Sequence, residues 1–180
     1  MKTKRKSYAC IAVLTAPAIL FGAAVLAQTA PAATWRQATA AELQQALPAR
    51  APVATERIET DMKSASGITD GQGKYIADVV LITAGYSAEG KYSHFFLTQV
   101  PLELGGSLHL DPGDYVLGYQ RADQGVVVHF YHAATGHPAG DVTAQRITTG
   151  FRVESFRIWP PAEHSWIQIG RFRIAYRIGG

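Results

Sequence analysis

The side chains best suited to chemistry in this chain are histidines and carboxylates that fall in or beside predicted turns. They are His109, Asp111, Asp114, His132, His137, Glu163 and His164. Neutral imidazole and carboxylate groups are ligands that Zn²⁺ and Cu²⁺ accept in proteins. None of the spacings between these residues is a known metal-ligand signature. A metal site therefore requires the fold to bring at least three such groups together, and the candidates are His109, Asp111, His132 and His137.

A serine in the segment Gly85–Gly90 forms the second pattern that suggests chemistry. The segment reads Gly-Tyr-Ser-Ala-Glu-Gly and follows a valine-rich stretch. It resembles the nucleophile elbow of the α/β-hydrolases, in which a strand, a Gly-x-Ser-x-Gly turn and a helix follow each other. Glu89 stands where that tight turn needs a small residue, and the next segment has the pattern of a strand. We therefore interpret Ser87 as part of a hairpin turn and predict no catalytic residue.

The first 27 residues have the pattern of a secretory signal peptide. Basic residues at positions 2–6 precede an apolar run over 8–27, and small residues follow. Cleavage fits after Ala27 or after Ala32. The alternative is an uncleaved anchor, because an apolar run of about 20 residues can cross a bilayer. The small residues at both cleavage sites favour removal, so we expect a periplasmic or secreted protein with no transmembrane span after cleavage.

The net charge of +3 comes from this signal segment. Its removal takes the 17 basic residues to 13, against 14 acidic ones, so the mature chain is nearly neutral. This balance gives no reason to expect a basic face for nucleic acid, and we exclude nucleic acid as a partner. Cys10, the one cysteine in the sequence, also lies in the signal segment. Burial of apolar side chains must therefore stabilise the exported domain without a disulfide.

Alternation and turn signals divide the mature chain into a tether and a β-domain. Residues 28–56 are expected to form a tether with a short helix and a linker, and Thr39 and Glu42 fit a capping box for that helix. Over 57–180, strand-like stretches alternate with turn signals. This spacing predicts an all-β domain, a single antiparallel β-sandwich or small barrel of about eight strands.

Two stretches of the β-domain have patterns with specific structural meaning. Residues 75–86 are nearly all apolar, which is typical of a strand covered on both faces. Residues 165–178 are expected to form one strand, with Gly170 as the bulge or bend that brings its apolar residues onto one face. The other face then holds Arg171, Arg173 and Arg177. We interpret it as a solvated face that discourages edge pairing rather than as a basic binding stripe.

If the hairpins run up and down, three turns gather at one end of the domain. They are the turn at 111–114, the loop at 133–140 and the segment 160–164. Loops held at one end of a rigid sandwich are a common place for binding sites. The ligand-binding candidates at this rim are Asp111, Asp114, His132, His137, Trp159 and His164. His94 is expected near the opposite end.

These features predict an exported, non-catalytic β-domain that binds an unidentified ligand or envelope protein through the rim loops. The first alternative is a Zn²⁺- or Cu²⁺-binding protein or metalloenzyme at the same rim. The second is a structural envelope protein that associates through an isolated strand edge near 57–65. A barrel with an empty apolar interior would instead indicate a carrier of lipid-like molecules. The sequence identifies no cofactor.

Overall fold

The computed structural model of the chain describes residues 34–88, 90–123 and 125–179. The predicted signal peptide and its cleavage sites lie outside the described residues. Within this part, the chain is all-β apart from one short helix, α1 (Ala40–Ala46), which confirms the predicted fold class. No helix of the described residues is both long enough and apolar enough to cross a membrane.

The strands of the described chain are more numerous than the sequence predicted. They are β1 (Arg36–Gln37), β2 (Arg50–Val53), β3 (Glu56–Thr69), β4 (Tyr75–Leu81), β5 (His94–Thr98), β6 (Leu102–Leu104), β7 (Leu108–Leu110), β8 (Gly113–Ala122), β9 (Gly125–His132), β10 (Pro138–Arg146), β11 (Glu154–Ile158), β12 (Trp166–Gly170) and β13 (Phe172–Ile178). The prediction of about eight is corrected because 165–178, expected to form one strand, is broken into β12 and β13, and residues 92–104 contain both β5 and β6. Residues 34–56 also contribute β1, β2 and α1 to the fold.

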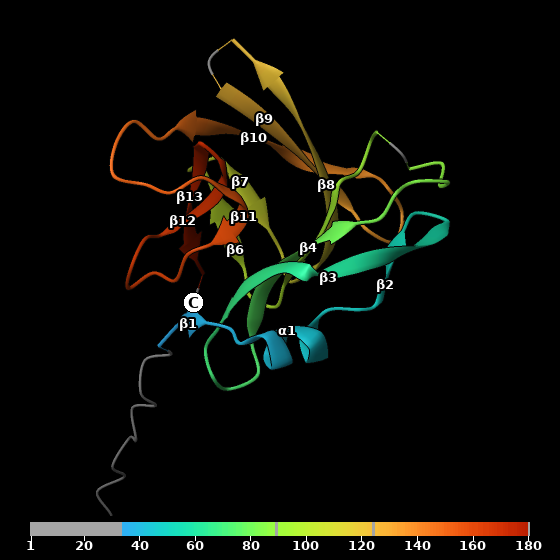
Figure 1. The fold of residues 1–180 in the computed structure, drawn as a ribbon, viewed down its shortest axis with the longest axis horizontal. Helices are drawn as coiled ribbons and strands as arrows, with labels where there is room; N and C mark the ends of the chain where they lie inside the picture. The colour runs from blue at the N-terminus through green and yellow to red at the C-terminus, as the bar shows by residue number, and fades with distance from the viewer. Residues whose placement is uncertain (1–33, 89, 124, 180) are drawn as a thin grey trace, which may run out of the picture. The chain divides into compact units, whose positions relative to one another are not determined.

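The strands form one curled antiparallel sheet, a half-barrel, rather than the two stacked layers of a sandwich. Its order is β1-β3-β4-β5-β8-β9-β10-β13-β12-β11, with β2 attached to β3 and β6 attached to β13 and β7. The curl brings β11, at one end of this order, against β3 near the other (Figure 1). The backbone N–H of Ile158 on β11 donates to the hydroxyl of Ser66 on β3 at 3.0 Å. The side chain of Ser66 therefore links β3 to β11, and we call this contact between the two strands the seam.

The chain runs up and down from β8 through β10 and then crosses over. β9 pairs with β8 and β10, as the hairpin prediction requires, and Ala122 faces Gly125 at the predicted turn. After β10 the chain passes to the far edge of the sheet, forms β11 and β12, and returns as β13 beside β10. This crossover carries the 160–164 loop away from the strands that hold the other two rim turns.

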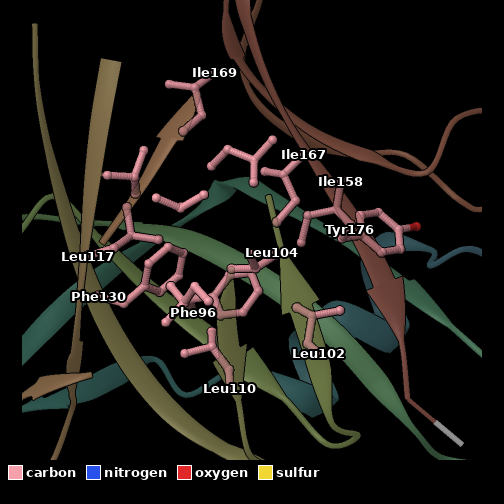
Figure 2. Close-up of a cluster of buried hydrophobic side chains, with 14 of the residues drawn as sticks. Phe96, Leu102, Leu104, Leu110, Leu117, Phe130, Ile158, Ile167, Ile169 and Tyr176 are labelled. Atoms are coloured by element: carbon pink, nitrogen blue, oxygen red, sulfur yellow. The ribbon is translucent and has the colours of Figure 1, made fainter. Parts of the chain in front are cut away.

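Apolar side chains fill the concave side of the sheet. Figure 2 shows Phe96, Leu117 and Phe130 from one wall meeting Leu104 and Ile167 from the other. Phe96 and Phe130 pack edge to face, with their ring centroids 5.6 Å apart. This packed interior differs from the empty apolar cavity that a carrier of lipid-like molecules requires.

The convex side of β3, β4 and β5 has its own apolar cluster beneath α1. Ala77, Val79 and Phe95 are buried there against Leu43 of the helix. A methyl group at Gly67 would stand 2.8 Å from Leu43, so the missing side chain lets α1 lie close to the sheet. β4 is thus covered on both faces, which confirms the interpretation of its continuous apolar sequence.

Two local motifs explain how the chain starts its helix and ends its last hairpin. The predicted capping box is present, because the Glu42 N–H donates to Thr39 Oγ1 and the Thr39 N–H donates to the Glu42 carboxylate. Arg36 also donates to Glu42, and together these bonds hold the pKa of Glu42 at about 2. Gly170, at φ +59°, reverses the chain fully between β12 and β13. The predicted single bent strand is therefore a hairpin, and Ile167 pairs with Ile174.

Candidate functional site

The rim residues predicted from the sequence fall into three separate groups. Asp114 and His132 line one hollow, at the start of β8 and the end of β9. Backbone bonds hold this group together: Ala133 N–H donates to Asp114 O at 3.0 Å, and His132 N–H donates to His137 O at 2.9 Å. Burial raises the pKa of Asp114.

His109 and Asp111 belong to a second hollow, beside the β6–β7 hairpin. His109 Nε2 lies 3.9 Å from an oxygen of Glu103, and the imidazole is largely exposed. The backbone carbonyl of Asp111 accepts a hydrogen bond from the Tyr115 hydroxyl at 2.8 Å. This hollow and the one at His132 share no lining residue.

Trp159 and His164 form the third group, in the connection between β11 and β12. The His164 ring stacks on Trp166 at 4.1 Å, and Trp159 meets His164 edge-on at 5.4 Å. Arg157 and Arg173 lie over the two indole rings. Across all three groups, and in the rest of the chain that the structure describes, no set of three or more His, Cys, Asp or Glu side chains is placed to hold a metal ion.

Two strongly perturbed ionisable groups lie elsewhere, in a buried pair formed by Asp78 of β4 and His94 of β5. Asp78 is fully buried, and neither of its carboxylate oxygens has a hydrogen-bond partner. Its Oδ2 stands 4.0 Å from Nε2 of His94, which is 4% exposed. Burial raises the pKa of Asp78 well above its ordinary value and lowers that of His94 to about 4. His94 is therefore neutral at pH 7, and burial favours the protonated, neutral form of Asp78.

The other nitrogen of His94 is fixed by a serine hydroxyl. Nδ1 lies 2.9 Å from Ser93 Oγ, and that hydroxyl donates its own proton to the Leu117 carbonyl at 3.3 Å. We assign the His94 proton to Nδ1 on this basis, which leaves Nε2 unprotonated and facing Asp78. At 4.0 Å the pair is close but too long for a hydrogen bond. Phe156 covers the imidazole, with ring centroids 5.0 Å apart.

An open pocket of about 460 Å³ leads from the surface to His94, the outer member of this pair. Ser93 and His94 line it together with Val80, Tyr119 and Ser155. Tyr119, one of the exposed large hydrophobic residues of the described chain, also lines the pocket, and exposed Ile82 lies between the lining residues Leu81 and Thr83. The pocket thus combines apolar side chains with the polar groups of Ser93 and His94.

Close backbone packing holds the pocket wall formed by residues 90–93. The Lys91 carbonyl lies where the side chain of any other residue at Gly118 would stand, so glycine is required at that point of β8. Ser93 N–H donates to Leu117 O at 2.8 Å, and Leu81 N–H donates to Ser93 O at 2.9 Å. The ammonium group of Lys91 lies 4.9 Å from the Tyr92 ring centroid. These contacts set the position of Ser93 beside His94.

Sequence reasoning missed Asp78 as a functional residue, although the sequence held a signal. Asp78 is the single charged residue of the apolar stretch 75–86, and an acidic side chain inside a doubly covered strand must be buried. From the sequence, His94 is expected near the end opposite the rim turns. The pairing of β5 with β4 and β8 places the pocket beside His94. Ser87 lies in the loop between β4 and β5, where its hydroxyl donates to Glu56 at 2.8 Å.

No protein-family model matches the chain, and no curated protein or solved structure matches it either. The chemistry of the site therefore follows from its own geometry. A buried carboxyl with a raised pKa beside a cleft is typical of functional sites. His94, with a pKa of about 4, is a weak base at pH 7, and the Ser93 proton points to a backbone carbonyl. This arrangement suits binding through neutral hydrogen bonds better than activation of Ser93 as a nucleophile.

Proposed function

We propose that this protein is an exported, non-catalytic binding domain whose ligand site is the pocket over Ser93 and His94. The observation that carries the proposal is the coincidence of three features at one place. A buried carboxyl without a hydrogen bond stands against an imidazole, an open pocket reaches that imidazole, and the exposed ring of Tyr119 lines the same pocket. The signal-peptide pattern of the first 27 residues supports export.

The pocket chemistry favours a small uncharged ligand with an apolar body and one hydrogen-bond donor. Val80 and the Tyr119 ring offer apolar contact. Ser93 Oγ has already given its proton to Leu117 and accepts from His94, so it retains acceptor capacity for a ligand N–H or O–H. A charged ligand is disfavoured, because the burial that raises the pKa of Asp78 and lowers that of His94 also penalises a charge bound beside them.

The buried Asp78 also argues for a function. A carboxyl group without hydrogen bonds in a packed interior destabilises the folded state, and natural cores rarely retain one. An apolar residue at this position of β4 would continue the sequence of its neighbours Ala77 and Val79. Retention of the acid at a cost in stability is expected where the group serves a site.

Titration with p-cresol and toluene, followed by amide chemical shifts, tests this proposal. The two probes have the same apolar body, but p-cresol carries a hydroxyl that can donate to Ser93 Oγ. We expect p-cresol to bind about fivefold more tightly than toluene, the value of one neutral hydrogen bond, with shifts at Val80, His94 and Tyr119. Ser93→Ala should remove this difference, and Ser107→Ala, an exposed serine between β6 and β7, should keep it.

Two results would contradict the proposal. The first is the absence of saturable shifts at the pocket with either probe. The second is the same preference for p-cresol in Ser93→Ala as in the natural protein, with the thermal unfolding temperature of the variant confirming that it folds.

A further inference from the structure

Three arginines that are distant in the sequence meet at the end of the half-barrel where the Ser93–His94 pocket opens. Arg121 is near the end of β8, Arg146 ends β10, and Arg171 lies between β12 and β13. Together with Phe172 they line one hollow of about 550 Å³. Pairing of Arg146 with Phe172, and the bond from Ile147 N–H to Arg171 O at 2.8 Å, fix the two hairpins side by side.

Among the described residues, the guanidinium groups of these three arginines have no hydrogen-bond or ion-pair partner. In the described part of the chain, the arginines that lie within 4.0 Å of a carboxylate are Arg36, Arg157 and Arg177. Arg121, Arg146 and Arg171 make neither such a contact nor a side-chain hydrogen bond there. Asp123 is the single acidic residue among those lining the hollow. Three arginines and one aspartate thus line this hollow, which leaves an excess of positive charge there.

The two arginines of β13, by contrast, each have a partner. Arg173 lies over the Trp166 ring at 4.7 Å, and Arg177 stands 3.9 Å from Glu103. Arg171 has neither an aromatic nor an acidic partner, although the sequence suggested one common solvated face for all three. The hairpin turn at Gly170 separates Arg171 from that face and directs it to the hollow.

We propose that this hollow is a binding site for a phosphate group, either free or as the headgroup of a lipid. Guanidinium groups donate paired N–H bonds to oxyanions, and a tetrahedral phosphate presents enough oxygens to accept from several of them at once. A bound dianion would offset the repulsion between the three guanidinium groups around this hollow. Phe172 provides an apolar wall next to the charged groups.

Calorimetric titration with inorganic phosphate at an ionic strength of about 0.15 M, where exposed charges are screened within about 8 Å, tests the free-anion form. We expect saturable binding that Arg121→Gln/Arg146→Gln weakens by about tenfold or more. The matched control is Arg57→Gln/Lys63→Gln, which removes the same charge from exposed positions on β3. This control should change the affinity by less than about twofold, because general surface attraction is weak and screened. Ser93→Ala should leave phosphate binding unchanged, which separates this site from the proposed ligand pocket.

Co-sedimentation with vesicles of phosphatidylcholine, with and without phosphatidic acid, tests the headgroup form. Binding that requires phosphatidic acid and is lost in Arg121→Gln/Arg146→Gln, but not in the control, assigns the site to a lipid headgroup. Binding of inorganic phosphate alone, with the same dependence on the two arginines, assigns it to free phosphate. Failure of both probes to bind, or equal weakening by both double variants, overturns the proposal.

Discussion

Strands β4 and β5 bury both of their faces, yet the two faces have different chemistry. The convex face, under α1, consists of apolar side chains such as Val79 and Phe95. The concave face places Asp78 and His94 among side chains such as Phe96. Val79 and Phe95 on one face and Asp78 and His94 on the other are all buried, so burial by itself does not explain the difference. The convex face only stabilises the sheet, whereas the concave face includes a polar pair that destabilises it and opens to a pocket.

Truncation on the convex face should have the largest effect and should not depend on pH. Phe95 is 1% exposed, so Phe95→Ala removes a buried ring and leaves a cavity. We expect a loss of about 3–5 kcal/mol in the free energy of unfolding. Urea denaturation at about pH 5 and about pH 8 should give the same loss, because no ionisable group is involved. A loss that differs between the two pH values would show that the faces are coupled.

Replacement of Asp78 on the concave face should change the free energy of unfolding by an amount that grows with pH. The folded-state pKa of Asp78 is raised, so folding keeps a proton that the unfolded chain releases above its ordinary pKa of about 3.9. The natural protein therefore loses about 1.4 kcal/mol per pH unit from this group as pH rises toward the folded pKa. Asp78→Asn does not titrate. The free energy of unfolding of Asp78→Asn, minus that of the natural protein, should therefore rise with pH at that slope. A difference that does not change with pH would refute the raised pKa of Asp78.

Replacement of His94 should change the pH dependence in the opposite direction and within a narrower range. The folded-state pKa of about 4 is below the unfolded value of 6.5, so the unfolded chain takes up a proton first as pH falls. The natural protein therefore loses stability from His94 as pH falls from 6.5 to about 4. His94→Phe should lack this loss. Comparison of its urea denaturation curves with those of the natural protein at several pH values in this range measures the difference.

Together these two slopes explain why the natural protein should tolerate mild acid. Between about pH 4 and pH 6.5 the contribution of His94 to stability rises with pH, and the contribution of Asp78, whose folded-state pKa is raised, falls with pH and so opposes it. The double variant Asp78→Asn/His94→Phe should be flat throughout, apart from the effects of surface groups.

Local chemistry predicted much of the fold. The capping box at Thr39 and Glu42, the turn between Ala122 and Gly125, and the double covering of β4 all follow from residues near each other in the sequence. What could not be predicted depends on distant contacts. The hydrogen bond from Ile158 to Ser66 joins residues 92 positions apart, and no local pattern shows that the sheet curls to bring them together.

The rim prediction shows the same limit for the site. Counting turns placed Asp114, His132 and His137 near each other, and the β8–β9 and β9–β10 pairings do so. It did not show how far around the sheet each turn lies, because that depends on the crossover after β10. Asp78 was visible as an isolated acid in an apolar strand, but its neighbour His94 is known only once β4 and β5 are paired in register.

The contact between β11 and β3, the seam, is a line along which the half-barrel can open locally. A ladder of backbone bonds resists separation along its whole length, whereas a side-chain bond such as Ile158 to Ser66 breaks in a single step. Phe156, which covers His94, belongs to β11 and moves with it. Parting of the seam would therefore admit water to the imidazole and restore its affinity for protons. By thermodynamic linkage, protonation of His94 and opening of the seam would promote each other.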